Sequence, residues 1–149
     1  MHTRCQEPNY VEVVNQNLER LLVFETVFKE YVHTCKNIEK GNCYASESLD
    51  HLRLYFTKNV MKFCTFVDSV DAEAAPCNYA AFHKVLVNGL RGIRGGVLNM
   101  LQAIGTDKVD HDRFAAGLAE QQAARAEIDT AFSKILDPIF KPITRFFVA

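Results

Sequence analysis

The sequence predicts an all-α protein: an antiparallel up-down-up-down four-helix bundle with a short apolar C-terminal segment. Two observations lead to this prediction. Along four segments, apolar residues recur at alternating steps of three and four, which is the spacing of one face of an α-helix. The breaks between these segments are short, about five to eight residues each, and short connections join antiparallel neighbouring helices.

Length and composition indicate a single domain over residues 1–149. A chain of 149 residues buries about two thirds of the surface that it exposes when unfolded. The net charge is −1, and basic and acidic residues are interleaved along the chain, so no basic patch points to nucleic acid. No apolar run approaches the roughly 20 residues that cross a bilayer, so we expect no membrane span.

The first helix is predicted over residues 9–40. Its apolar residues form a seam of the kind that packs in bundles, but Glu25 also falls in this seam. A carboxylate in a core needs a partner or a raised pKa. Glu25 therefore either turns toward solvent or makes a buried polar contact. The apolar members of the seam are Val11, Val14, Leu18, Leu21, Phe28, Val32 and Cys35.

The second helix is predicted over residues 46–70, with Ser46 or Ser48 as its N-cap. Pro76 then ends the connection that follows, and Asn78 is expected to cap the next helix. The apolar face of the second helix consists of Leu49, Leu52, Phe56, Val60, Phe63, Val67 and Val70.

The third helix, residues 79–104, is the most unusual segment because it contains four interior glycines. Each interior glycine costs a helix roughly 1 kcal/mol relative to alanine. Small residues allow two helices to approach more closely than the usual 8–10 Å, so we expect another backbone or a bound molecule beside them. Three glycines share one flank of the apolar arc: Gly89, Gly92 and Gly96. The opposite flank is basic and includes Arg91 and Arg94.

The fourth helix is predicted over residues 113–136, with Asp110 or Asp112 as its N-cap. Its apolar seam is interrupted near the middle by Arg125, and Glu25 interrupts the first helix near its own middle. We therefore expect the charged groups of Glu25 and Arg125 to meet in one layer of the bundle, within about 6 Å.

The last segment, residues 137–149, is apolar for a chain end. Pro138 and Pro142 are expected to stop the fourth helix before it. Two interpretations remain open: the segment folds back over the end of the bundle, or it is a contact surface for a partner. Its aromatic residues are Phe140, Phe146 and Phe147.

The five cysteines are irregularly spaced and form no zinc-binding pattern. The first residues do not read as a signal peptide. We therefore expect a cytoplasmic protein with reduced thiols. The alternative is a secreted chain whose leader has been removed, with a disulfide between Cys35 and Cys43 across the first break.

No hydrolase elbow, phosphate-binding loop or metal motif occurs in the sequence, so an enzyme is not expected. His51 and His83 lie on consecutive predicted helices, at a separation that resembles that of the two haem-pocket histidines in globin-like proteins. This resemblance implies haem or another apolar ligand, with His83 as the axial ligand and His51 as the distal group. Phe28 and Phe56 would lie near that ligand.

The preferred expectation is a non-catalytic protein-interaction module that binds a protein partner or a second copy of itself and carries no cofactor. The alternative is the binding of haem or another hydrophobic ligand between the helices. The expected interaction surface is either a flank of the third helix or the aromatic end, and its residues are Gly89, Gly92, Gly96, Arg91, Arg94, Phe140, Phe146 and Phe147.

Overall fold

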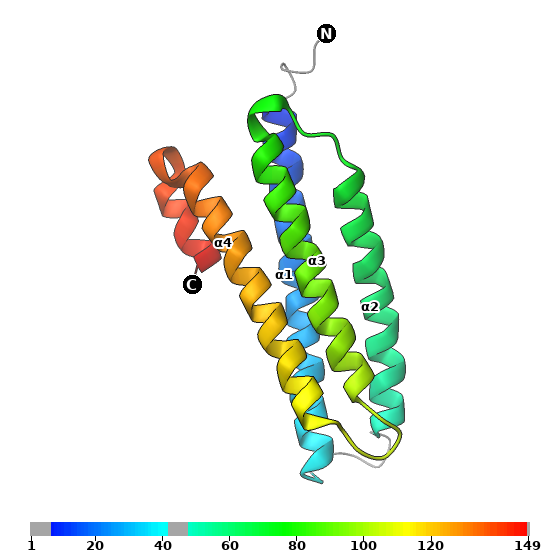
Figure 1. Ribbon diagram of the computed structural model, residues 1–149. Coiled ribbons are helices and arrows are strands. Elements are labelled where there is room, and N and C mark those ends of the chain that lie inside the picture. The colour runs from blue at the N-terminus through cyan, green and yellow to red at the C-terminus, as the bar shows by residue number, and fades with distance from the viewer. Residues whose placement is uncertain (1–6, 42–47, 149) are drawn as a thin grey trace.

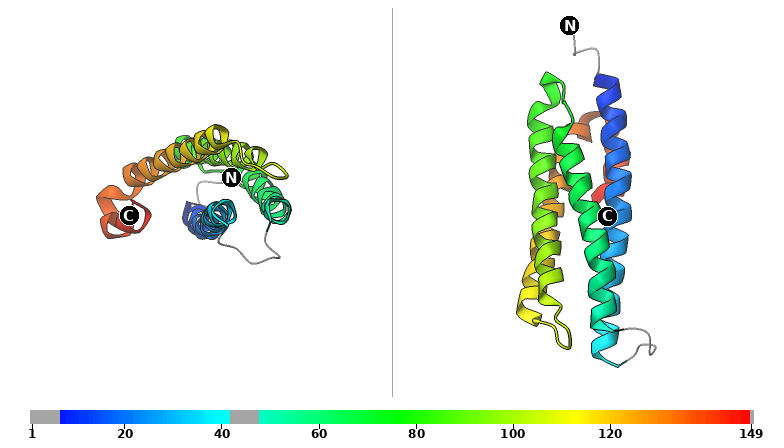
Figure 2. Two further views of the ribbon diagram at one scale, coloured as in Figure 1. Left: turned by 90° about the horizontal axis from the view of Figure 1, so that it is seen from below. Right: turned by 90° about the vertical axis from the view of Figure 1, so that its right-hand side faces the viewer.

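The chain is all-helical, and its helices pack side by side (Figure 1). The computed structural model describes the backbone of residues 7–41 and 48–148, and the side chains of residues 9–41 and 48–135. In the end-on view of Figure 2, α2, α3 and α4 form a curved row, and α1 lies on its concave side. The helices within these ranges are α1 Glu7–Glu39, α2 Leu49–Ala72, α3 Ala80–Ala103 and α4 His111–Val148, with a 3-10 turn, η2, at Cys77–Tyr79.

Two of the predicted N-caps are present. The side chain of Ser48 accepts a hydrogen bond from the amide of His51 at 3.2 Å. At the start of α4, Asp110 Oδ1 accepts from the amide of Arg113 at 3.1 Å. Both bonds satisfy amides that the first helical turn leaves without a partner.

The prediction that Asn78 caps the third helix is wrong. Pro76, with φ −60°, leads into η2, and Asn78 lies inside that turn. The amide of Ala80 already donates to the Cys77 carbonyl, so η2 continues directly into α3. The short turn therefore takes the place of a side-chain cap.

The predicted end of the fourth helix at residue 136 is also wrong. Helix α4 continues through Pro138 and Pro142 to Val148. A proline inside a helix removes one hydrogen bond and bends the helix without always ending it. Figure 1 shows the ribbon of α4 turning back on itself in its last part. The side chains of the predicted aromatic contact surface lie outside the described residues.

Aromatic rings fill the contact between α1 and α2. The ring centroid of Phe28 lies 6.0 Å from that of Phe56 and 5.4 Å from that of Phe63. One turn earlier in α1, Phe24 contacts Phe63 and Phe66 at 5.2 and 5.5 Å. Such pairs add about 0.5–1.5 kcal/mol beyond the burial of their surface.

Helices α3 and α4 make their closest approach at two glycines, Gly96 and Gly117. A Cβ atom on Gly96 would lie 2.6 Å from the carbonyl oxygen of Gly117 and 2.7 Å from the amide nitrogen of Gln121. A Cβ atom on Gly117 would lie 2.6 Å from the carbonyl oxygen of Gly96. Both positions therefore require glycine because the opposing backbone occupies the space of a side chain.

No helix in the described ranges has both the length and the apolar character that a membrane span needs.

The glycine contact predicts different effects on stability for two adjacent substitutions. Gly96→Ala is expected to lower the free energy of unfolding by about 2 kcal/mol, because the clashing atoms belong to the backbone and overpacking typically costs about 1–3 kcal/mol. Gly95→Ala is the matched control. Its Cβ would meet the carboxylate of Glu120 at 2.9 Å, at the end of a flexible side chain. This variant should be unchanged or up to about 1 kcal/mol more stable, since alanine favours the helix. Urea unfolding followed by circular dichroism measures both, and equal effects would contradict the packing.

Candidate functional site

The glycine flank of α3 faces α4 of the same chain. Gly89 and Gly96 are buried, and Gly92 is half-buried. A Cβ atom on Gly92 would lie 2.7 Å from the Cβ of Ala124, and one on Gly89 would overlap the side chain of Ile128. The backbone expected beside the glycines is therefore α4 of the same chain.

The basic flank of α3 faces acidic residues of α2. Arg91 Nη2 donates to Asp71 Oδ2 at 2.6 Å, and Arg94 Nη1 donates to Asp68 Oδ1 at 3.3 Å. Each arginine thus has an ionic partner inside the chain. Both flanks of α3 therefore make contacts within the chain.

Glu25 and Arg125 lie together between α1 and α4. Arg125 Nε is 2.8 and 3.0 Å from the two carboxylate oxygens of Glu25, well inside the expected 6 Å. Arg125 Nη1 also donates to Asp129, so one guanidinium serves two carboxylates. Burial raises the pKa of Glu25 above its usual value, and the charge of Arg125 opposes that shift. The pKa of Asp129 is raised by burial in the same way.

His51 and His83 do not face each other. His83 is buried at the start of α3, where Nδ1 lies 2.8 Å from the hydroxyl of Tyr10 and Nε2 lies 3.0 Å from the carbonyl oxygen of Val70. Val70 is in the last turn of α2 and His51 is in the first, about 28 Å away along the helix.

The expected haem pair is therefore not assembled. Both ring nitrogens of His83 have partners within the chain, so neither is available as an axial ligand in this arrangement. Phe28 and Phe56 are fully buried and pack against each other in the core. Within the described residues, no group of three or more potential metal-ligating side chains is found.

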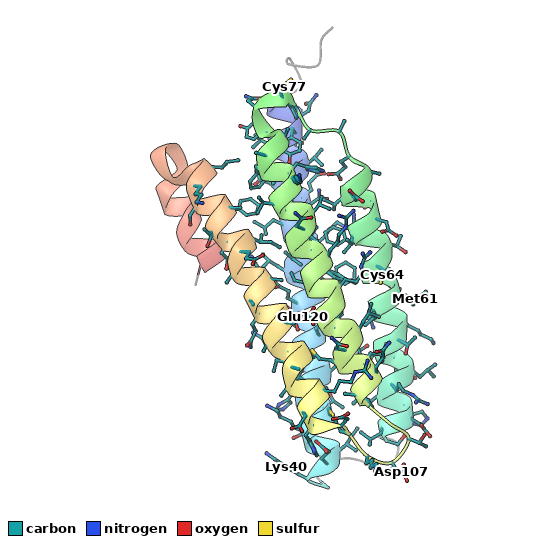
Figure 3. All side chains as sticks on the ribbon, in the orientation of Figure 1. Lys40, Met61, Cys64, Cys77, Asp107 and Glu120 are labelled. Carbon is teal, nitrogen blue, oxygen red and sulfur yellow. The ribbon has the colours of Figure 1, made fainter. Side chains whose placement is uncertain are left out.

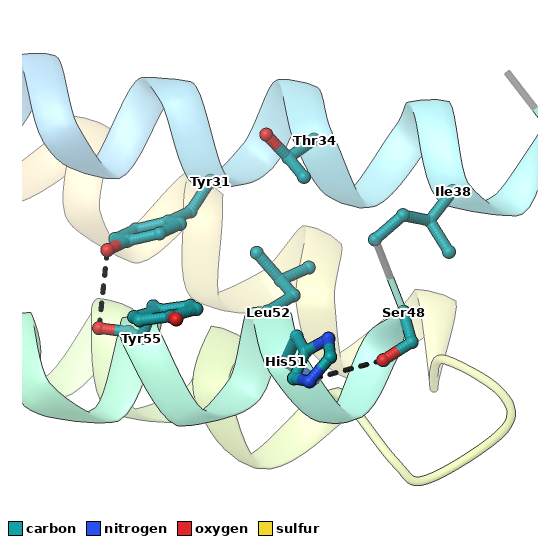
Figure 4. A pocket seen from close by; sticks show the side chains of 7 residues that line it. All are labelled: Tyr31, Thr34, Ile38, Ser48, His51, Leu52 and Tyr55. Carbon is teal, nitrogen blue, oxygen red and sulfur yellow. Dashed lines mark hydrogen bonds between the residues drawn. The ribbon is translucent and has the colours of Figure 1, made fainter. Parts of the chain in front are cut away.

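A groove between α1 and α2 is the candidate binding site (Figure 4). Its volume is about 320 Å³, and it lies beside the N-terminus of α2. Tyr31 and Tyr55 close one end, where the hydroxyl of Tyr31 donates to the carbonyl oxygen of Tyr55 at 3.2 Å. The lining residues are Tyr31, Thr34, Ile38, Ser48, His51, Leu52 and Tyr55.

Large exposed apolar side chains gather on the same two helices. In the described part of the chain, five of the six lie on α1 or α2, and the sixth is Val85 on α3. In Figure 3, Met61 points away from the bundle on the outer side of α2. The five are Leu22, Val23, Leu54, Tyr55 and Met61.

The sequence-based expectation placed the site on α3 because it gave weight to the unusual glycines and arginines of that helix. A signal for the α1–α2 surface was present: Leu54 and Tyr55 lie off the main apolar face of α2. Apolar residues off that face can be buried on a second side or exposed, and the periodicity alone does not distinguish these cases.

No known protein family, curated protein or solved structure matches the chain. The candidate site therefore rests on the geometry of this chain.

The raised pKa of Glu25 predicts how stability depends on pH. The folded state holds the Glu25 proton more tightly than the unfolded chain does, so this contribution is complete below the unfolded value, near 4.5, and is lost as pH rises through the folded value. Glu25→Gln keeps a neutral side chain of the same size. The stability of the native chain relative to Glu25→Gln should therefore fall as pH rises from the unfolded value through the folded pKa of Glu25, as measured by urea unfolding. A difference that grows with pH would contradict this sign.

The thiols of the described cysteines are expected to react at different rates. Burial raises the pKa of Cys35 to about 11, so little thiolate forms at neutral pH. Cys77 is exposed on η2. With iodoacetamide, we expect Cys77 to be alkylated at least about a hundredfold faster than Cys35. Peptide mass spectrometry measures both rates, and urea should abolish the difference. Similar rates in the folded protein would show that Cys35 is accessible. Cys43, its expected disulfide partner, lies outside the described residues.

Proposed function

We propose that the protein is a non-catalytic protein-interaction module, an up-down-up-down four-helix bundle that binds its partner through the outer surface of α1 and α2. The observation that carries this proposal is that five of the six large exposed apolar side chains of the described residues lie on these two helices, and that one of the five, Tyr55, lines the groove between them. Apolar groups that gather on one part of a surface mark interaction sites more often than single exposed ones do.

Contacts at the helix ends support the proposed topology. Asn17, early in α1, donates to the carboxylate of Glu73 just after α2, at 2.9 Å. At the other end of α1, Glu39 pairs with His111 at the start of α4, at 2.6 Å. These contacts fit helices that alternate in direction along the chain.

The groove suits a peptide or helix side chain. It combines aromatic and aliphatic walls with the hydroxyl groups of Thr34 and Ser48. An amphipathic helix inserts apolar anchors into such a groove, and nearby polar groups fix its position. No part of this arrangement requires a chemical step.

A small apolar ligand is the second candidate occupant. The groove volume, about 320 Å³, is near the lower end of the roughly 300–1,000 Å³ of ligand sites. Tyr31 and Tyr55 could stack against an aromatic ligand. Native mass spectrometry of the purified chain distinguishes such a ligand from a protein by the added mass.

Site-specific photo-cross-linking tests the proposed surface. A photoreactive side chain at position 54 should yield a discrete protein adduct in an extract of the source cells. The same group at position 85 is the matched control, because Val85 is 42% exposed and Leu54 is 50% exposed. Tyr55→Asp should abolish the position 54 adduct without loss of helicity, because a charge in the centre of an apolar contact is desolvated without a partner. Equal labelling at both positions would contradict the proposal.

A further inference from the structure

The outer side of α1 carries a stripe of negative charge. Glu12, Glu19, Val23 and Glu30 are spaced by seven, four and seven residues, which places them on one line along the helix. We call these four residues the α1 stripe. All four are exposed, Val23 to 65%, and no ion pair joins the three glutamates to another described residue.

The outer side of α2 carries positive charge. Leu54, Lys58, Met61 and Lys62 follow one another at steps of four, three and one, and we call them the α2 patch. Leu54 is 50% exposed and Met61 is 62% exposed. Lys58 lies 5.5 Å from the ring of Tyr55, and neither lysine forms an ion pair with a described residue.

The acidic residues of α2 do not neutralise the α2 patch. Asp50, Asp68 and Asp71 each pair with an arginine, at 3.7, 3.3 and 2.6 Å respectively. The charges of the α1 stripe and the α2 patch are therefore unpaired, of opposite sign, and interspersed with exposed apolar side chains.

The C-terminal half of the α1 stripe, Val23 and Glu30, lies at the height of the α2 patch. The hydroxyl of Tyr31 contacts Tyr55 and Asn59, while Phe24 packs against Phe63 and Phe66. Residue numbers thus rise along α1 as they fall along α2. Glu30 is therefore level with Lys58, and Val23 lies within about one turn of Met61.

We propose that the occupant of this surface is a second copy of the chain, in a twofold dimer that places Val23 and Glu30 of the α1 stripe of each copy on the α2 patch of the other. The proposal rests on the proposed function and names its partner. Rotation by 180° about an axis parallel to α1 and α2 lays α1 of one copy across α2 of the other at the same height. Glu30 of each copy then faces Lys58 of the other, so this contact occurs twice.

The available face is large enough for a dimer. Helix α2 has 24 residues, or about 36 Å, and two helices side by side present a face about 20 Å wide. The resulting face of about 700 Å² is close to the roughly 800 Å² that each partner buries in a standard interface. An anionic membrane fits less well because it would repel the α1 stripe.

Sedimentation equilibrium of the full chain, with reductant to prevent disulfides, tests the dimer. Across micromolar to millimolar concentrations, the native chain should approach twice its mass of 16.9 kDa. Lys58→Glu alone and Glu30→Lys alone should each weaken the dimer about tenfold or more, because each places like charges opposite one another twice. An equimolar mixture of the two variants should restore a dimer. In the mixed pair, the two introduced residues, which have opposite charges, face each other in one contact, and the native Glu30 faces the native Lys58 in the other.

Apolar variants supply a second measurement. Met61→Asp should yield a single-chain mass, whereas Val85→Asp on α3 should leave the dimer intact. A native chain that remains single at all concentrations overturns the dimer, as does a mixture of charge variants that fails to associate. If the native chain stays single while the position 54 cross-link contains a different protein, the dimer is wrong and the proposed function stands. If no adduct forms and the chain stays single, both are wrong.

Discussion

The backbone contact between Gly96 and Gly117 sets how α4 sits against the rest of the protein. With no side chain between the helices at this point, neighbouring residues are drawn into close contact, so that Ala124 packs on Gly92 and Ile128 on Gly89. With α4 held in this orientation, Arg125, the residue after Ala124, faces Glu25 on α1. The helix-propensity cost of the α3 glycines, roughly 1 kcal/mol each, is offset by the packing that they allow.

The ion pairs that join the first two helices to the last two are all arranged in the same sense. In the described residues, each pair that joins α1 or α2 to α3 or α4 takes its acid from the first half and its base from the second. The glycine contact holds α3 and α4 together, aromatic rings hold α1 and α2 together, and these ionic contacts fix how the two pairs meet. A shift by one helical turn would separate the charges, so the arrangement specifies register more than it adds stability. The ion pairs are Glu25 with Arg125, Asp68 with Arg94 and Asp71 with Arg91, and the hydrogen bond between Glu39 and His111 joins the two halves in the same sense.

Much of the fold follows from local patterns in the sequence. Apolar periodicity predicts four helices, and two charged residues inside apolar seams predict that Glu25 and Arg125 meet. The glycines predict that another helix packs closely on the third helix, but they do not indicate which one. The sequence also leaves open whether an arginine beside the apolar arc is free or paired, because Asp71 and Asp68 lie on a different helix from Arg91 and Arg94. The surface of α1 and α2 was missed because exposure depends on which helices are neighbours, and that is a tertiary property.

The two hydrogen bonds of His83 determine which of its ring nitrogens carries the hydrogen. A carbonyl oxygen can only accept, so in the neutral imidazole Nε2 carries the hydrogen that is donated to Val70. Nδ1 then has a lone pair facing Tyr10, whose hydroxyl must be the donor. The phenol of Tyr10 on α1 donates to the imidazole of His83 on α3, and the imidazole donates to a main-chain carbonyl on α2. A single tautomer of His83 therefore links three helices. Replacement of this ring by one that can only accept or only donate would leave one of the two neighbours without a partner in a buried position.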